Sequence, residues 1–178
     1  MNGGYSSSPL EAEGLNICWL RRDLRLQDNA ALYHALKSDH PVLVLFIFDQ
    51  NILDKLPKND ARVTFIYQTL VVIKKELQNK GSDLLFKYGN PEIIWPELLQ
   101  DYNVKGVYIN NDYEPYARER DDSMAEFLAS ENIDFRTFKD QVIFEKSEVV
   151  KDDTTPYVVY TPYSNKWKEN FKKIKLIH

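Results

Sequence analysis

The chain has 178 residues, of which 43% are hydrophobic, and its formal net charge at pH 7 is -4. This length is enough for one ordinary globular domain with a substantial core and some flanking chain. The acidic balance argues against a protein that coats nucleic acid by bulk electrostatics. No stretch reaches the roughly 18 apolar residues that a membrane span needs, and the single cysteine, Cys18, fits a reducing compartment. We therefore expect a cytoplasmic protein without a membrane partner.

Residues 1–15 are rich in Gly and Ser and show no apolar period. They also lack the basic start and apolar middle of a signal peptide. The pattern predicts a disordered tail.

A short apolar run, Asn16 to Leu20, reads as a strand that is buried on both faces. Arg21, Arg22, Asp23 and Arg25 follow it directly. Such a cluster most often forms an ion-pair network. Adjacent guanidinium groups can also clamp a carboxylate or phosphate, and the carboxyl end of a strand in an open α/β sheet is where ligands are usually held. Both interpretations remain open at this stage.

A helix is expected next, with Asp28 as its N-cap. Its apolar stripe comprises Ala31, Leu32, Ala35 and Leu36. After the break at His40-Pro41, the apolar, β-branched run Val42–Phe48 predicts a second buried strand that is closed by Asp49.

From Asp60 the apolar residues recur at three and four positions, which predicts a long amphipathic helix that ends at Gly81. Its stripe comprises Phe65, Ile66, Leu70, Ile73 and Leu77. Leu84–Tyr88 reads as a third strand. Pro91 suits the first position of the following helix, whereas Pro96 implies either a kink or a helix that begins only at Trp95.

Val104–Ile109 reads as a fourth strand, and a polar loop from Asn110 to Tyr116 follows it. A helix comes next, and Ile133–Phe138 is the fifth strand. The helix carries Ala117, Met124, Phe127 and Leu128. Strands that alternate with helices predict an α/β fold, a doubly wound five-stranded parallel sheet of order 3-2-1-4-5 with helices on both faces. Its switch point lies between the first and fourth strands.

The sequence lacks several motifs that mark well-known catalytic and nucleotide-binding sites. It has no G-x-G-x-x-G fingerprint, no P-loop and no G-x-S-x-G elbow, and its three histidines are not at metal-ligand spacing. We therefore expect no catalytic residue and no metal site within these residues.

Four segments carry a resemblance to a known family. They are W-L-R-R-D-L-R-L-Q-D-N-A-A-L from Trp19 to Leu32, the strand end F-I-F-D, N-D-Y-E-P-Y-A-R-E-R-D from Asn111 to Asp121, and Y-T-P-Y-S-N-K-W from Tyr160 to Trp167. In this order they resemble the N-terminal α/β antenna domain of a deoxyribodipyrimidine photolyase, in the photolyase/cryptochrome family. The resemblance extends from Asn16 to Trp167.

The resemblance implies a light-dependent lyase in which reduced FAD donates an electron to a cyclobutane pyrimidine dimer in DNA. In that family a C-terminal helical domain holds the FAD and binds the UV-damaged DNA. Residues 16–138 would then be the α/β domain and residues 139–178 the start of the interdomain linker. We expect the 178 residues alone to be inactive and not to retain FAD, and we expect a monomer whose partner is its own C-terminal domain.

The resemblance also implies an antenna chromophore in the α/β domain. Folate-binding members carry an Asn-Glu pair where Tyr116 and Ala117 stand here, so a deazaflavin or another flavin-like chromophore, or an empty pocket, is favoured over folate. The expected pocket lies between the loops after the first and fourth strands. Its residues would be Phe48 as the wall and Arg22, Asp49 and Asn111 as the anchors. The alternative is that these residues pack against the C-terminal domain.

The last segment predicts a further helix, with Ser164 as a possible cap and an apolar stripe at Trp167, Phe171 and Ile174.

Two other functions remain open. One is the same domain in a cryptochrome, a blue-light receptor without repair activity. The other is a nucleotide-binding module of similar fold, which would bind ATP or AMP but lacks a glycine-rich phosphate loop.

Overall fold

The computed structural model describes residues 14–145 and 147–174. The chain divides into two compact units between Asp140 and Gln141. Of the predicted disordered tail, residues 1–13 lie outside the described residues, and β1 begins at Leu15. No helix within the described ranges is long and apolar enough to cross a membrane.

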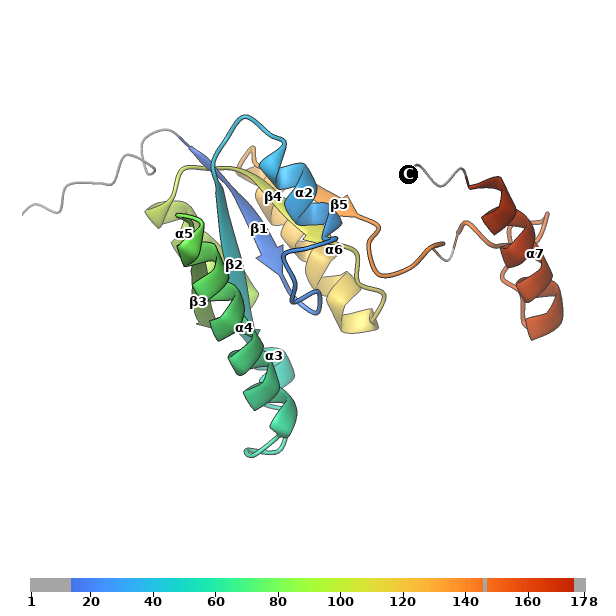
Figure 1. Ribbon diagram of the computed structural model, residues 1–178, viewed down its shortest axis with the longest axis horizontal. Coiled ribbons are helices and arrows are strands. Elements are labelled where there is room, and N and C mark those ends of the chain that lie inside the picture. The colour runs from blue at the N-terminus through green and yellow to red at the C-terminus, as the bar shows by residue number, and fades with distance from the viewer. Residues whose placement is uncertain (1–13, 146, 175–178) are drawn as a thin grey trace, which may run out of the picture. The chain divides into compact units, whose positions relative to one another are not determined.

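The first unit contains a five-stranded parallel sheet in the order β3-β2-β1-β4-β5, which confirms the predicted topology (Figure 1). The strands are β1 (Leu15–Leu20), β2 (Val42–Asp49), β3 (Leu84–Gly89), β4 (Val104–Asn110) and β5 (Asp134–Phe138). Every residue of the central strand β1 is buried, as its apolar sequence predicts.

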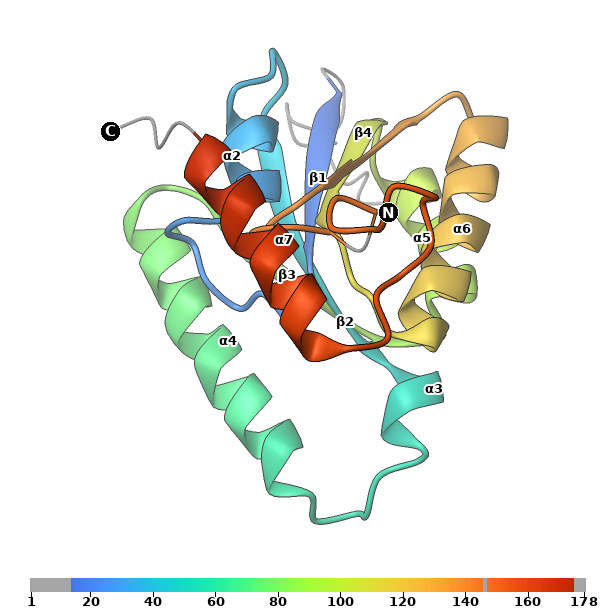
Figure 2. The ribbon, with the colours of Figure 1, turned by 90° about the vertical axis from the view of Figure 1, so that its right-hand side faces the viewer.

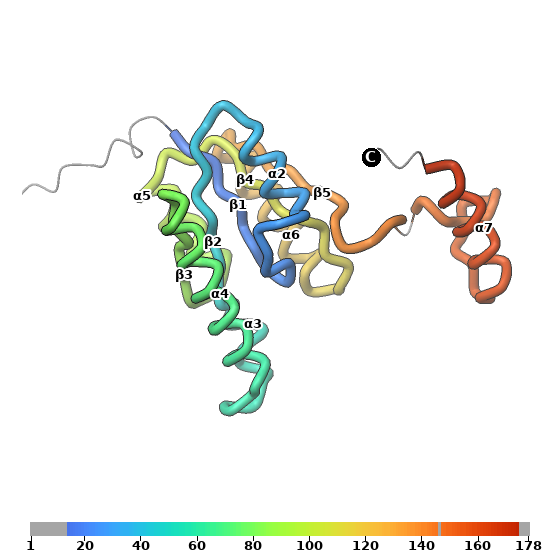
Figure 3. The backbone as a smooth tube through the Cα atoms, in the orientation of Figure 1, coloured from blue at the N-terminus to red at the C-terminus, as the bar shows by residue number. Residues whose placement is uncertain are grey.

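Helices cover both faces of the sheet, as Figure 2 shows, with α2 and α4 on one side and α5 and α6 on the other. The helices of this unit are α2 (Ala30–Leu36), α3 (Gln50–Leu53), α4 (Ala61–Asn79), α5 (Pro91–Asp101) and α6 (Pro115–Ser130). Figure 3 follows the chain as it leaves β2 through α3 and turns back along α4. This excursion places α3 beside the carboxyl end of β2.

The core under α5 and α6 is built around two tryptophans. Trp19 on β1 and Trp95 on α5 meet edge to face, with ring centroids 5.4 Å apart. Both rings are buried, and the indole nitrogen of Trp95 has no hydrogen-bond partner among the residues that the structure describes. The pair fixes α5 against the central strand.

The first helix begins one residue later than predicted. Asn29 is the N-cap of α2, because its side-chain oxygen accepts from the backbone N–H of Leu32 at 3.1 Å. Asp28 has a φ of 51°, in the left-handed region, so it belongs to the preceding turn and cannot supply the extended backbone of a cap. The prediction of Asp28 as the cap was therefore wrong.

In the first unit, two residues of the predicted apolar stripes are exposed. Leu36 is the last residue of α2 and is 64% exposed, while Phe65 is 67% exposed. The first turns of α4 extend past the sheet in Figures 1 and 2, so only its second half has a sheet to cover. In α5, the helix starts at Pro91 and includes Pro96, so the alternative start at Trp95 was wrong.

The second unit contains α7 (Tyr160–Lys173). Trp167 stacks on Phe171 at 5.1 Å and meets Phe144 edge to face at 5.5 Å. Ser164 lies inside α7, which begins after Val159, so it is not the cap. That residues 139–178 begin an interdomain linker remains a prediction.

Candidate functional site

A cavity of about 320 Å³ lies where the carboxyl ends of β1 and β2 meet α3, α4 and α6. Ligands of open parallel sheets bind at this edge, outside the carboxyl ends of the strands. The loops that follow β1 and β4 both contribute, through Arg21 and Arg22 on one side and Asp112 and Glu114 on the other. The cavity therefore lies at the carboxyl edge of the sheet.

One wall of the cavity is apolar. Phe48, near the end of β2, lines it and meets Phe46 edge to face at 4.9 Å. The wall continues through α3, the following turn and α4, with Ile52, Leu53, Leu56, Val63 and Ile66. Because α3 begins directly after β2, its side chains are brought beside Phe48 by chain connectivity alone.

The base of the cavity is a buried ion-pair network around Trp19. Arg21 and Arg120 lie over this ring, with guanidinium carbons 5.7 and 5.1 Å from its centroid. Their side chains are only 6% and 7% exposed. Asp121 pairs with both, directly with Arg21 and at 3.2 Å with Arg120. The two buried cations thus share one carboxylate.

Asp49 is a second buried carboxylate in the cavity, and the chain's own donors already engage it. It accepts from the backbone N–H of Asn51 at 3.0 Å and from the hydroxyl of Tyr116 at 2.6 Å. The side-chain amide of Asn51 in turn donates to the Tyr116 oxygen at 3.1 Å. Arg120 approaches Asp49 to 3.7 Å. These contacts tie α6 to the end of β2 and to α3.

Two guanidinium groups at the cavity are exposed to solvent. The Arg22 side chain is 60% exposed and pairs with Glu114, and the Arg62 side chain is 71% exposed and pairs with Asp60 at 2.7 Å. Exposed pairs of this kind contribute about 0 to 1 kcal/mol. Either guanidinium group can therefore turn to a bound ligand at little cost.

These features fit a flat aromatic ligand. The volume is at the lower end of the range for ligand pockets, and an apolar wall faces a few fixed polar groups. The three carboxylates that line the cavity, Asp49, Asp112 and Glu114, each already accept from donors of the chain, so the cavity favours a ligand that accepts hydrogen bonds. A ring whose edge carries hydrogen-bond acceptors matches this lining better than a ring whose edge carries donors.

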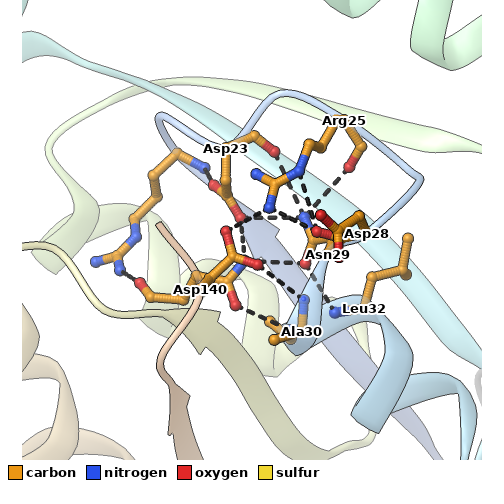
Figure 4. Close-up of polar contacts among 10 residues, drawn as sticks. Asp23, Arg25, Asp28, Asn29, Ala30, Leu32 and Asp140 are labelled. Carbon is orange, nitrogen blue, oxygen red and sulfur yellow. Dashed lines mark hydrogen bonds and ion pairs between the residues drawn. The ribbon is translucent and has the colours of Figure 1, made fainter. Parts of the chain in front are cut away.

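Asp23 organises a second polar cluster, at the switch point between β1 and β4 (Figure 4). It accepts from the backbone N–H of Arg21 at 2.9 Å and from the side-chain amides of Asn29 at 3.1 Å and Asn110 at 2.6 Å. The neighbouring guanidinium groups have other carboxylate partners. Arg21 pairs with Asp121 instead, and Arg25 pairs with Asp140 at 2.6 Å.

Side chains of this cluster also cap the start of α2. The N–H groups of Ala30, Ala31 and Leu32 donate to Asp140, Asn110 and Asn29 at 3.0, 2.9 and 3.1 Å. In nucleotide-binding α/β folds, such amides at the first helix hold the phosphates. Here they are occupied, which counts against a nucleotide-binding module at the switch point.

The sequence matches the family model of DNA photolyase over residues 16–177. The chain belongs to the DNA photolyase family. A deoxyribodipyrimidine photo-lyase of Synechococcus sp. is 34% identical over 151 residues, which cover 85% of this chain and 31% of that protein. Cryptochrome DASH of Arabidopsis thaliana is 34% identical over 113 residues, which cover 60% of this chain and 20% of that protein.

Solved structures of photolyases share the fold. A class III photolyase from Agrobacterium tumefaciens has a TM-score of 0.74 at 28% identity, covering 84% of this chain and 30% of that one. An archaeal photolyase from Sulfolobus tokodaii, described with two FAD molecules and a novel light-harvesting cofactor, has a TM-score of 0.72 at 26% identity, covering 92% and 36%. The chain spans about a third of the length of these photolyases.

In this photolyase-family chain, three of the four predicted pocket residues, the wall and two of the three anchors, line the same cavity. Arg22, Phe48 and Asp49 line the cavity. Asn111 is not among the described residues that line it, and its backbone N–H donates to the Phe138 carbonyl at 2.7 Å, which extends the pairing of β4 with β5. Within residues 14–145 and 147–174, no group of three or more His, Cys, Asp or Glu side chains could hold a metal ion.

Sequence reasoning missed other lining residues, namely Trp19, Arg62, Tyr116 and Arg120. Tyr116 and Arg120 are four residues apart on α6 and therefore share one face of the helix, which is a signal that the sequence does contain. Nothing in the sequence indicated that this face would meet Trp19.

Burial and the hydrogen bond to Asp49 raise the pKa of Tyr116 to about 12. A pKa raised above the unfolded value of about 10 means that the hydrogen bond contributes fully below pH 10 and is lost as the pH rises through about 12. We expect Tyr116→Phe to remove a tyrosinate absorbance step near pH 12 from a spectrophotometric titration. A wild-type minus variant difference that titrates near pH 10 would contradict this assignment.

Proposed function

We propose that this chain is the antenna-chromophore domain of a light-dependent deoxyribodipyrimidine photolyase. The observation that carries the proposal is the cavity at the ends of β1 and β2, which combines an apolar wall with buried polar groups in a chain of the photolyase family. The full-length protein would repair cyclobutane pyrimidine dimers in UV-damaged DNA by electron transfer from reduced FAD. The FAD and the DNA would be bound by a C-terminal helical domain, the chain's own partner, in a monomeric cytoplasmic enzyme.

The lining supports a deazaflavin or flavin-like antenna rather than folate. Tyr116 and Ala117 stand where folate-binding members carry an Asn-Glu pair, so the carboxylate that would accept from a pterin is missing. Asp49 is already engaged by Tyr116 and Asn51. The description of the Sulfolobus tokodaii photolyase with two FAD molecules and a novel light-harvesting cofactor also supports a flavin-class ligand.

The same domain of a cryptochrome is the second candidate, because relatives of the chain include cryptochromes as well as photolyases. The two functions predict the same cavity and differ in residues of the C-terminal domain. Repair of a dimer-containing oligonucleotide under blue light, by the chain joined to its FAD domain, would separate them.

A binding titration tests the antenna proposal. We expect FMN and a 5-deazaflavin to quench the tryptophan fluorescence of the chain saturably, because Trp19 lies against the cavity, and we expect methenyltetrahydrofolate to bind more weakly. Asp49→Ala should weaken FMN binding about tenfold, since it removes the group that fixes Tyr116 and faces Arg120.

Arg22→Ala tests the exposed side of the cavity, and we expect a smaller loss of affinity. Asp54→Ala is the matched control, because Asp54 follows α3 but does not line the cavity. Circular dichroism must show that each variant is folded. Saturable FMN binding that survives both Asp49→Ala and Arg22→Ala would place the antenna elsewhere.

A further inference from the structure

The cavity contains a phenol with a built-in proton acceptor. Tyr116 and Asp49 both line it, and the Tyr116 hydroxyl donates to Asp49 Oδ2 across 2.6 Å. The position of the phenol is fixed on several sides, since Asn51 donates to its oxygen at 3.1 Å and the Lys55 ammonium lies 5.5 Å from its ring centroid. The hydrogen bond is therefore held by contacts of the chain itself.

A phenol that is hydrogen-bonded to a carboxylate can donate an electron to a photoexcited ligand. A flavin-type ring in its excited state is a strong one-electron oxidant, and phenols are among the readiest electron donors in proteins. Electron loss turns a phenol into a very strong acid, so the transfer is favourable only where a base can take the proton at once. Asp49 is a carboxylate at hydrogen-bond distance and meets this condition.

Trp19 is the other oxidisable side chain at the cavity, and its surroundings disfavour that role. Loss of an electron would place a positive charge on the indole between Arg21 and Arg120, whose guanidinium carbons lie 5.7 and 5.1 Å from the ring centroid. Like charges at this distance repel strongly in a buried site. Oxidation of Tyr116 with loss of its proton leaves a neutral ring and avoids this cost.

We propose that Tyr116 and Asp49 form a light-driven electron and proton donor pair for the chromophore held in this cavity. The inference rests on the proposed function, because it requires a flavin-class ring in the cavity. On excitation, Tyr116 gives one electron to the ring, and its O–H bond breaks as the proton moves to Asp49 Oδ2. A neutral phenoxyl radical and a protonated carboxyl group result, while the ring gains one electron.

In the dark the electron returns to Tyr116 and the proton returns from Asp49, so no external oxidant or reductant is consumed. Arg120 lines the cavity, and its positive charge stabilises the electron on the ring, while the same charge, 3.7 Å from Asp49, opposes protonation of that carboxylate. The pair would quench excited chromophore whose energy is not transferred to an acceptor. It would thereby limit the lifetime of the antenna's excited state.

Time-resolved fluorescence of FMN bound to the chain tests this role. Tyr116→Phe should lengthen the lifetime of bound FMN severalfold, since it removes the hydroxyl and keeps the ring. Asp49→Asn should also lengthen it, because the amide is a far weaker base. Exchange of H₂O for D₂O should lengthen the lifetime in the wild type but not in Tyr116→Phe. Tyr113→Phe is the control, since Tyr113 is in the same segment but does not line the cavity.

The outcomes separate the two proposals. Absence of FMN binding by the folded wild-type chain overturns the proposed function and this inference with it. FMN binding with equal lifetimes in the wild type and Tyr116→Phe overturns the donor pair alone. Transient absorption should show a phenoxyl radical in the wild type that is missing in Tyr116→Phe. An indole radical in both proteins would assign the donor to Trp19 and overturn the role of Tyr116.

Discussion

Replacing Asp121 by Asn is expected to lower the thermal unfolding midpoint of the chain by roughly 10 °C or more. Asp121 is the carboxylate shared by Arg21 and Arg120, and both guanidinium groups are buried beside Trp19. The amide preserves the shape of the side chain but removes the negative charge that both buried cations share. Among the described residues, Arg120 keeps a carboxylate, Asp49, at 3.7 Å. Breaking a buried pair in this way costs about 3 to 5 kcal/mol.

Asp122→Asn is the matched control, because Asp122 is the next residue on α6 and is exposed. Its midpoint should stay within experimental error of the wild type. Adding Arg120→Met to Asp121→Asn should recover part of the lost stability. The second substitution removes one of the two guanidinium charges that Asp121→Asn leaves uncompensated. A midpoint unchanged by Asp121→Asn would mean that water reaches this network and that the base of the cavity is open.

The sheet order follows from the sequence because two physical rules act together. The strands β1 and β2 are apolar on both faces, so both faces must be covered by helices. Neither strand is therefore expected at an edge of the sheet. Right-handed crossovers between parallel strands then leave few topologies. The ends of the helices were harder to predict, because Asp and Asn are equally favourable N-cap residues and Asp28 and Asn29 are adjacent. Only the turn held by Arg25, which donates to the Asp28 carbonyl at 2.6 Å, decides between them.

The site was predictable where it is made by strand ends. Phe48 and Asp49 close an apolar run, and the carboxyl end of a parallel strand faces the ligand edge of the sheet. Arg120 was not predictable, because a charged residue in the middle of a helix is normally solvated. Its burial depends on Trp19 and Asp49, which lie about 100 and 70 residues away in the chain. Tertiary packing alone brings these groups together.

The two polar clusters are joined by Arg21. Its guanidinium group pairs with Asp121 at the base of the cavity and also donates to the backbone carbonyl of Asn110. The side chain of Asn110 in turn donates to Asp23 at 2.6 Å and to Asn29 at 2.9 Å. The base of the cavity is therefore linked to the switch point of the sheet. A substitution that disrupts the Asp23 cluster should thus also change the cavity.

Asp23→Ala is expected to destabilise the fold by about 3 kcal/mol, because three part-buried donors each lose the carboxylate that accepts from them. The donors are the side-chain amides of Asn29 and Asn110 and the backbone N–H of Arg21 (Figure 4). Denaturation in urea should show a lower midpoint with an unchanged slope. Asp23→Asn should cost less, since its remaining oxygen still accepts from one amide.

The same variant separates the two interpretations of the charged cluster after β1. If Asp23 holds the switch point together, Asp23→Ala lowers stability and also weakens FMN binding, because Arg21 loses the backbone position that directs it to Asp121. Asp39→Ala, in the exposed loop after α2, should change neither property and serves as the control. If Asp23 instead served a ligand, Asp23→Ala would leave the urea midpoint of the free chain unchanged and alter binding alone. That result would overturn the structural role, because three part-buried hydrogen bonds cannot be lost without a cost to the folded state.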